Sequence, residues 1–404
     1  MAHGDMITQK AYGIANAADK VYVSPQGYLE WFGYSVDYAF LKGALEKLEI
    51  EPQIFYAGKF KSATEPFRTD KMTPENQLQT SVWLNDLYSD LLMTTAEARK
   101  MDTGTLRLLA NEGVIKNAKN AFDHKLVDGL KYDDEIKDEI KSKLKIDKYE
   151  KINFVTINTY FAASTLEKLT GEKIALIYAE GDIIDGKSGQ GSIGSETYRN
   201  LIRKARLDRS VKAIVLRVNS GGGSSMASEN IWRELELAKK EKPVVVSFGD
   251  VAASGGYYIA CAADSIFALP TTITGSIGVF GIIPNMQAFF KNKLGVTFDG
   301  VKTGPYADAM ATTRPMNENE RKMIQAEIEM IYTQFKQRVA DGRKIDTAYV
   351  DSIAQGRVWT GTRAKGIGLI DRFGGIDEAV KCAARMAKLT NYRVNEYPEA
   401  AKYL

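Results

Sequence analysis

Two glycine-rich turns carry the residues of this sequence that are best suited to chemistry. The first is Asn-Ser-Gly-Gly-Gly-Ser at 219–224, and the second is Ala-Ala-Ser-Gly-Gly-Tyr at 252–257. Glycines between a buried strand and the start of a helix expose backbone N–H groups that can bind an anion. Ser254 stands where a helix begins, and Gly255 and Gly256 leave room for a substrate backbone. Together the turns indicate a serine nucleophile beside donors for a developing oxyanion.

Each turn also has a simpler interpretation. Ser254 could be an ordinary helix N-cap, and the run at 219–224 could be a tight connection. A phosphate loop is disfavoured, because Gly-Lys-Ser/Thr does not follow and the glycine spacing is not that of a dinucleotide fingerprint.

A nucleophilic serine needs a proton acceptor, and the sequence contains only two histidines, His3 and His124. We expect His124 to lie at a helix end outside the glycine-rich turns, and His3 to lie in a disordered end of the chain. A lysine base is then the remaining standard solution, because Ser-Lys pairs are an established variant of the serine triad. Residue types alone do not select one lysine.

The composition excludes several classes of function. Lys plus Arg number 54 against 51 Asp plus Glu, a net charge of +3, which argues against a nucleic-acid binder. The two cysteines, Cys261 and Cys382, are too few for a disulfide scaffold or a structural zinc site, and we expect no cofactor. The uncharged stretch 265–290 is long enough in principle to span a bilayer. It contains prolines and a Thr- and Gly-rich run, however, so it predicts buried strands and turns instead of a membrane helix. We therefore expect the chain as given to be soluble.

Apolar segments that alternate with helical patterns must position the two turns. Strands are predicted at 174–178, 213–218 and 244–248, and helices at 195–206, 225–240 and 255–263. Near-continuous apolar strands between helices predict an α/β fold with a parallel sheet covered by helices. The apolar stretches 266–269 and 277–283 flank the proposed site. They could line a groove, although burial in the core is favoured.

One unit of sequence occurs twice. Gly4-Asp5 and Tyr12–Asp19 return 245 residues later as Gly249-Asp250 and Tyr257–Asp264. This interval, kept within a few residues along the chain, predicts a tandem duplication, with an N-terminal repeat at 1–150 and a C-terminal repeat at 151–404. The charge-rich residues 131–151 predict a solvated helix and connector. The first repeat lacks the front part that the second has. Either the chain is a truncated form of a longer protein or its first repeat packs against a partner, and truncation is favoured because a half-sheet would leave an open parallel edge.

Four segments in combination resemble the signal peptide peptidase A (protease IV) family, in its long tandem-repeat bacterial form. They are the two turns, Thr274–Gly278 and Gly58–Phe67. The resemblance covers essentially the whole chain and implies tandem ClpP/crotonase-like spiral units. It also implies a serine endopeptidase with a Ser-Lys dyad that degrades remnant signal peptides and other apolar, unfolded peptides. A homotetramer on the periplasmic face of the bacterial inner membrane is implied for the full-length form, whose N-terminal membrane anchor is absent here.

Carried over residue by residue, the resemblance implies three catalytic side chains and two backbone donors. Ser254 is the nucleophile, Lys61 is the base, and Ser276 is the hydroxyl that orients the lysine amine. The oxyanion donors are the N–H groups of Gly222 and Gly255. The sequence departs from the family at Gly221, where proline is usual.

The duplication agrees with a site shared between the repeats. The first repeat has Gln9 at the position of Ser254, and the second has Ala307 at the position of Lys61. Each repeat thus keeps one half of the dyad. Lys59 and Lys302 remain alternative bases that fit the motif less well.

A lysine base must be neutral, so its pKa has to fall from about 10.4 to near 7, which burial can achieve. Two other functions remain open. A crotonase-type acyl-coenzyme A hydratase or isomerase would use the same turns to hold a thioester oxygen, with carboxylates at the site. A truncated, non-catalytic scaffold would need no complete site.

Overall fold

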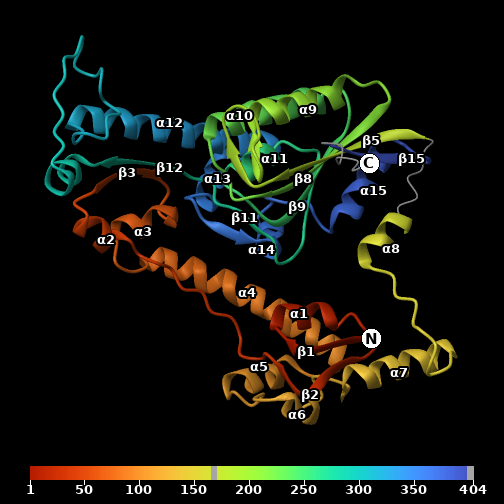
Figure 1. Ribbon diagram of the computed structural model, residues 1–404. Coiled ribbons are helices and arrows are strands. Elements are labelled where there is room, and N and C mark those ends of the chain that lie inside the picture. Colours follow the sequence, from red (N-terminus) through yellow and green to blue (C-terminus); the bar gives the residue numbers. More distant parts are fainter. Residues whose placement is uncertain (165–170, 398–404) are drawn as a thin grey trace. The chain divides into compact units, whose positions relative to one another are not determined.

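The computed structural model describes residues 1–164 and 171–397 (Figure 1). The chain forms two compact units: unit 1 is Met1–Val36 with Leu84–Leu166, and unit 2 is Asp37–Trp83 with Glu167–Leu404. This division differs from the two predicted repeats, because the segment that contains Lys61 packs with the C-terminal part of the chain. The repeat boundary near residue 150 stays a prediction about the sequence.

Unit 2 is built on one large sheet. Four strands lie side by side and parallel in the order β15 (Tyr392–Tyr397), β5 (Glu172–Glu180), β8 (Val211–Ser220) and β9 (Val244–Ala253). Two short strands, β10 (Ser265–Ala268) and β11 (Ile273–Gly275), both pair parallel with β9. The sheet is completed by β14 (Arg372–Phe373), parallel to β10, and β13 (Val358–Thr360), antiparallel to β11.

Helices cover both faces of this sheet. α9 (Ser195–Leu207) and α10 (Ser225–Lys239) lie on one face, and α15 (Ile376–Met386) lies on the other (Figure 1). Alternate residues of β5 enter different cores: Ile174 joins the core beneath α15, and Ala175 joins the core beneath α9 and α10. The predicted α/β fold with a helix-covered parallel sheet is confirmed, as are the strands and helices predicted between residues 174 and 248.

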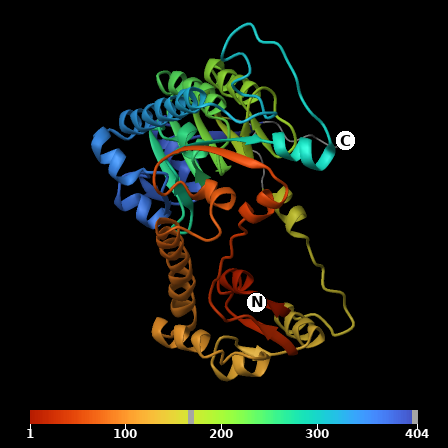
Figure 2. The same ribbon diagram turned by 90° about the vertical axis from the view of Figure 1, so that its left-hand side faces the viewer.

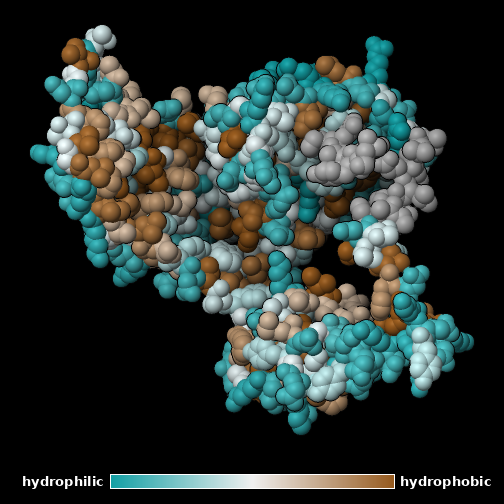
Figure 3. Space-filling view, viewed as in Figure 1, coloured by the Kyte–Doolittle hydropathy of each residue, from teal (hydrophilic) through white to brown (hydrophobic). Residues whose placement is uncertain are grey.

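A two-stranded antiparallel ribbon extends from this body. It pairs β3 (Glu51–Ala57) with β12 (Val279–Asn285), and α12 (Glu318–Arg343) runs beside it in both ribbon views (Figures 1 and 2). Hydrophobic residues, coloured brown, gather on this part of unit 2 in the space-filling view (Figure 3). The exposed apolar side chains of β12 and of the segment that follows it include Phe280, Leu294 and Phe298.

Shorter elements connect these parts of unit 2. Around the ribbon lie α2 (Lys42–Lys47), η1 (Ser62–Thr64), α3 (Glu65–Arg68) and the π-helical η2 (Phe289–Lys293). Around the sheet lie β6 (Asp182–Ile184), β7 (Ser192–Gly194), α11 (Gly255–Ala260), α13 (Thr347–Ile353) and α14 (Gly361–Gly366). Helix α11 ends three residues before the predicted helix 255–263, which was too long.

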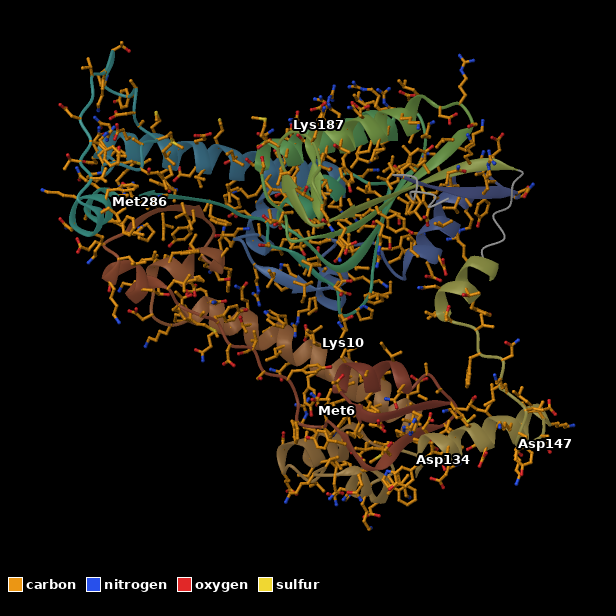
Figure 4. All side chains as sticks on the ribbon, in the orientation of Figure 1. Met6, Lys10, Asp134, Asp147, Lys187 and Met286 are labelled. Atoms are coloured by element: carbon orange, nitrogen blue, oxygen red, sulfur yellow. The ribbon has the colours of Figure 1, made fainter. Side chains whose placement is uncertain are left out.

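Unit 1 contains a parallel sheet of β1 (Ala2–Ile7), β2 (Val21–Leu29) and β4 (Gly129–Leu130). Its helices are α1 (Gln9–Ala15), α5 (Thr103–Asn111), α6 (Ala118–Asp123), α7 (Asp133–Leu144) and α8 (Ile157–Ser164). Helix α4 (Pro74–Arg99) begins in unit 2 and continues in unit 1. In Figure 4, Met6 marks β1 and Asp134 marks the charge-rich α7, which was predicted as a solvated helix.

Two sequence predictions about the termini and the uncharged stretch have clear outcomes. His3 belongs to β1, and its Nε2 lies 3.0 Å from Lys131 O, so the expectation of a disordered end was wrong. Residues 265–290 contain β10, β11 and β12, so the predicted strands and turns are confirmed. The expected burial holds for β10 but not for β12, which is only half-buried and whose Phe280 is 42% exposed. Across the described residues, we find no helix with both the length and the apolar composition needed to span a bilayer.

Candidate active site

Ser254 lies at the sharp turn between β9 and α11. Its φ is +52°, a left-handed value that is rare for a residue with a side chain. Such a conformation costs about 1–3 kcal/mol and is concentrated at functional sites. The Ser254 side chain makes no N-cap hydrogen bond to α11, so the interpretation as an ordinary cap was wrong. The turn instead holds the hydroxyl free for another partner.

That partner is Lys61, which follows the end of β3. Its Nζ lies 3.1 Å from Ser254 Oγ, 3.0 Å from Ser276 Oγ and 3.1 Å from Ser276 O. These three oxygens suit both protonation states of the amine. An ammonium can donate to all three, and a neutral amine can donate its two hydrogens to Ser276 while its lone pair accepts the Ser254 proton.

Burial sets the charge of this amine. The Lys61 side chain is only 4% exposed, and burial lowers its pKa from the ordinary value of 10.5 to about 7. The cause is desolvation, which disfavours the charged form. About half of the amines are therefore neutral near pH 7, against well under one in a thousand for a solvated lysine.

The strand register brings Ser276 to the same place. Gly275, at the end of β11, pairs with Ala253 of β9, and Ser254 N donates to Gly275 O at 2.9 Å. Ser276 itself has a φ of +51°, and its N donates to Arg357 O at 2.7 Å. Two serines at left-handed positions, each directly after one of two neighbouring strands, thus contact one buried lysine.

The first glycine-rich turn packs against the second. Gly222 has a φ of +104°, and a Cβ at this position would lie 2.5 Å from Gly255 N and 2.9 Å from Ser254 Cβ. Only glycine fits there. The Gly222 N–H donates to Ser220 Oγ at 3.1 Å, so it would have to exchange that acceptor for a substrate oxygen. Gly255 begins α11 directly after Ser254.

A cavity of about 280 Å³ opens beside Ser254. Glycine and serine residues, including Gly223 and Ser228, line the cavity together with Tyr258 and the apolar side chains of Val279, Phe280, Ile331 and Phe335. The apolar stretch 277–283 thus contributes two side chains to the cavity. In contrast, Ile266, Phe267 and Ala268 of the stretch 266–269 are buried in the core.

The other candidate residues lie elsewhere. Lys59 is exposed, and Lys302 forms an ion pair with Asp308 at 2.6 Å. His124 is exposed at the C-terminal end of α6, as expected of a residue outside the site. Cys261 and Cys382 are buried and unpaired. Within the described ranges, we find no group of three or more His, Cys, Asp or Glu side chains arranged to hold a metal ion.

No sequence pattern pointed to the residues that surround Lys61. Gln79, in α4, is 2% exposed and donates to Phe60 O at 3.1 Å. Gly356 has a φ of +73°, and a Cβ there would lie 2.7 Å from Lys61 Cβ. Neither residue belongs to a local motif, because both act only through contacts with distant parts of the chain.

Comparison with known proteins gives a family. The model of Peptidase family S49 matches residues 1–147 and 236–390. The chain is 40% identical to Protease 4 of Salmonella typhi over 406 residues, which is 98% of this chain and 65% of that protein. It is 34% identical to the chloroplastic serine protease SPPA of Arabidopsis thaliana over 391 residues, 94% of this chain and 57% of that protein. The chain thus spans about two thirds or less of these relatives. Among solved structures, a point mutant of ClpP1 from Listeria monocytogenes matches 51% of this chain and 94% of its own, at 16% identity and a TM-score of 0.34.

Proposed function

Since this chain belongs to Peptidase family S49, we propose that it is a serine endopeptidase in which Ser254 is the nucleophile and Lys61 the general base. The observation that carries the proposal is the 3.1 Å distance between Lys61 Nζ and Ser254 Oγ, made by an amine whose pKa burial lowers to about 7. Nucleophile and base are within hydrogen-bond reach, and the base is oriented by a third group, Ser276.

In the proposed reaction, Ser254 Oγ attacks the carbonyl carbon of a peptide bond while its proton passes to the neutral Lys61 Nζ. The resulting ammonium gives that proton to the leaving amine, and the peptide's acyl part stays on Ser254 as an ester. Water then gives a proton to Nζ and attacks the ester, and the proton returns to Oγ as the acid leaves. Ser276 holds the amine in place through both steps, which is how an orienting group contributes in Ser-His-Asp sites.

The backbone N–H groups of Gly222 and Gly255 are the proposed oxyanion donors. They belong to the two turns that contact each other at Ser254, and each well-aimed donor contributes about 3 kcal/mol to lowering the barrier. The donor at Gly222 must leave Ser220 Oγ to serve this role, so we propose that substrate binding completes the oxyanion site.

For the substrate, we propose apolar, extended peptides, including remnant signal peptides. The apolar side chains in the lining of the cavity next to Ser254 support this choice, because side chains such as Val279 and Phe335 would bind an apolar substrate residue. The family's homotetramer remains a proposal as well, to be tested by measuring the native mass of the chain in solution.

The crotonase-type alternative requires carboxylates at the site. The described residues that line the cavity are glycine, serine, tyrosine and apolar residues, with no Asp or Glu among them. This lining does not favour acyl-coenzyme A chemistry.

The proposal is tested by covalent labelling with a fluorophosphonate, followed by intact-mass analysis and peptide mapping. We expect a single adduct on Ser254 in the wild-type chain, and a labelling rate at least about 10²-fold lower in Lys61→Ala, since a positioned general base contributes that much or more. If Lys61→Ala were labelled at the same rate as the wild-type chain, Lys61 would not be the base. A folded wild-type chain that takes no label and does not cleave casein would instead favour the non-catalytic scaffold.

A further inference from the structure

We propose that Gln79 is a positioning residue, which keeps Lys61 within reach of Ser254 by bonding together two segments of backbone around the lysine. The inference rests on the proposed function, because it concerns how Lys61 is held as a base. Gln79 lies in the part of α4 that belongs to unit 2, and its side chain is 2% exposed.

The amide nitrogen of Gln79 binds both neighbours of Lys61. Nε2 donates to Phe60 O at 3.1 Å and to Ser62 Oγ at 3.0 Å. The chain on each side of the lysine is therefore fixed to the same buried side chain, so the Lys61 backbone cannot move relative to this part of α4 without breaking one of these bonds.

The amide oxygen of Gln79 binds the segment that holds Ser276. Gln79 Oε1 accepts from Val358 N at 3.3 Å, and Val358 pairs with Gly275 in the antiparallel contact of β13 with β11. The residue before it, Arg357, accepts the Ser276 N–H through its carbonyl oxygen. One amide thus links the backbone of the lysine to the backbone of the serine that orients its amine.

The two linked segments are packed without spare room. Phe60 N donates to Gln355 O at 2.8 Å, and a Cβ on Gly58 would lie 2.4 Å from Gln355 C. A Cβ on Gly356 would lie 2.8 Å from the Cα of Lys61. Because backbone touches backbone here, a small displacement of either segment moves Lys61 Nζ relative to the two serines.

Loss of the Gln79 amide should change both the reach and the charge of Lys61. Desolvation alone keeps its pKa low, so a loosened loop that admits water lets the pKa rise. The charged groups on the surrounding segments include Lys59 and Arg357, both over the Phe60 ring. They also include Glu65, which accepts from Asn76 Nδ2 and pairs with Arg68 at 3.7 Å. The Lys61 amine itself donates to oxygens of Ser254 and Ser276 and lies 5.9 Å from the centre of the Phe280 ring, and none of these three side chains is charged. A residue with a purely structural role would lower stability without moving the pH midpoint of the reaction.

The test measures the rate of fluorophosphonate labelling at Ser254 from pH 6 to pH 10. Gln79→Leu removes these three bonds together with the bond from Nε2 to Asn76 Oδ1 at 3.3 Å, and Ser62→Ala removes one of the three. The matched control is Gln53→Leu, because Gln53 is also a buried glutamine of unit 2, 1% exposed, and its Oε1 accepts from Met316 N at 2.8 Å. In Gln79→Leu we expect labelling at pH 7 to fall about tenfold or more and the midpoint to rise by about one pH unit.

Ser62→Ala should move the midpoint in the same direction by less, and Gln53→Leu should lower the melting temperature with the midpoint unchanged. An unmoved midpoint in folded Gln79→Leu, with Ser254 still labelled in the wild type, would overturn the positioning role and leave the proposed function standing. If Gln79→Leu does not fold, an unmoved midpoint in Ser62→Ala overturns it. A shift of the pH midpoint in Gln53→Leu equal to that in Gln79→Leu would also contradict the positioning role of Gln79. If the wild-type chain takes no label, the proposed function itself is refuted.

Discussion

Residues 5–33 of unit 1 and residues 250–278 of unit 2 correspond to each other at the interval of 245 residues, and they are held by the same kinds of contact. In unit 1 the Tyr12 hydroxyl donates to Leu126 O. In unit 2 the Tyr257 hydroxyl donates to Leu369 O at 2.9 Å. Both tyrosines are buried in the first helix after the corresponding strand.

A carboxylate repeats the pattern. Asp128 accepts from Val21 N at 2.8 Å and pairs with Arg99 at 2.8 Å. Asp371 accepts from Ile266 N at 2.7 Å and pairs with Arg343 at 2.5 Å. The two arginines end α4 and α12, which are both 26 residues long. Shared contacts of this kind are what a tandem duplication would leave, and they support that prediction.

The two regions differ where the chemistry would be. At the position of Ser254, unit 1 has Gln9, which is buried and whose Oε1 accepts from Phe32 N and Gly33 N, both at 2.9 Å. At the position of Ser276 it has Trp31, which is fully buried and donates to Leu106 O at 2.8 Å. In unit 1, the side chains at these two positions form hydrogen bonds with backbone groups of unit 1. In unit 2, the side chains at the corresponding positions contact the buried amine of Lys61. The supporting contacts can therefore be kept while the reactive groups are replaced.

The largest effect is expected from replacing Ser254, the proposed nucleophile, for which unit 1 has Gln9. Ser254→Ala should reduce cleavage of an unfolded substrate such as casein by at least about 10³-fold, because the nucleophile is lost. Adding Gln9→Ser should not restore cleavage, because the Lys61 amine meets the serines of unit 2. Gln9→Ser alone, with Ser254 intact, is the control. Recovered cleavage in the double variant would show that a serine at this position of unit 1 can replace Ser254.

The pH dependence follows from the amine of unit 2. With a pKa of about 7, its neutral fraction rises about tenfold between pH 6 and pH 8. We expect the second-order rate of casein cleavage to rise with it and to level off by pH 9. A rate that stays flat from pH 6 to pH 9 would show that no group of this pKa controls the reaction.

The free energy of unfolding should also depend on the protonation of Lys61, and the direction of its change with pH can be predicted. The unfolded lysine binds a proton up to about pH 10.5, but the folded one releases it above about 7, so stability due to this group rises with pH between these values. Lys61→Met removes the cost of burying charge. Relative to the wild type, it should therefore raise the free energy of unfolding at pH 6 by a few kcal/mol more than at pH 10. Urea unfolding at both values measures the difference, and an equal effect at both would contradict the burial of a charged amine.

The glutamine of unit 1 should matter for stability alone. Gln9→Ala leaves Phe32 N and Gly33 N without their acceptor, which should cost about 1–3 kcal/mol in the free energy of unfolding. Fluorophosphonate labelling of Ser254 should keep its wild-type rate. A large fall in labelling without loss of stability would mean that Gln9 takes part in the reaction.

The smallest effects test the contacts that the regions share. Asp128→Asn and Asp371→Asn each keep one side-chain acceptor and weaken the pair with arginine. We expect losses of about 1–2 kcal/mol, equal within about 0.5 kcal/mol. Thermal unfolding of the two variants measures them side by side. Strongly unequal losses would show that only one of the two networks supports its unit.

The sequence by itself determined the parallel α/β sheet of unit 2 and the turn that carries Ser254. Near-continuous apolar strands such as 213–218 and helices with apolar faces are local patterns, and two glycines between a strand and a helix are visible in the sequence. Their physical reason is not local, because a Cβ on Gly255 would lie 2.6 Å from Ser228 Oγ and one on Gly256 would lie 2.5 Å from Ser220 O. The base could be named only through the family resemblance. Residue types alone left every lysine open, because nothing local distinguishes Lys61 from Lys59.

Tertiary structure decided the rest. Pairing of β3 with β12 brings Lys61 to a serine 193 residues away, and close packing excludes the water that would keep its amine charged. The same packing makes Gln79 a neighbour of the lysine, and no sequence pattern connects this helix residue to a strand 279 positions later. Distance along the chain carries no information about such contacts, because they form only when the core closes around them.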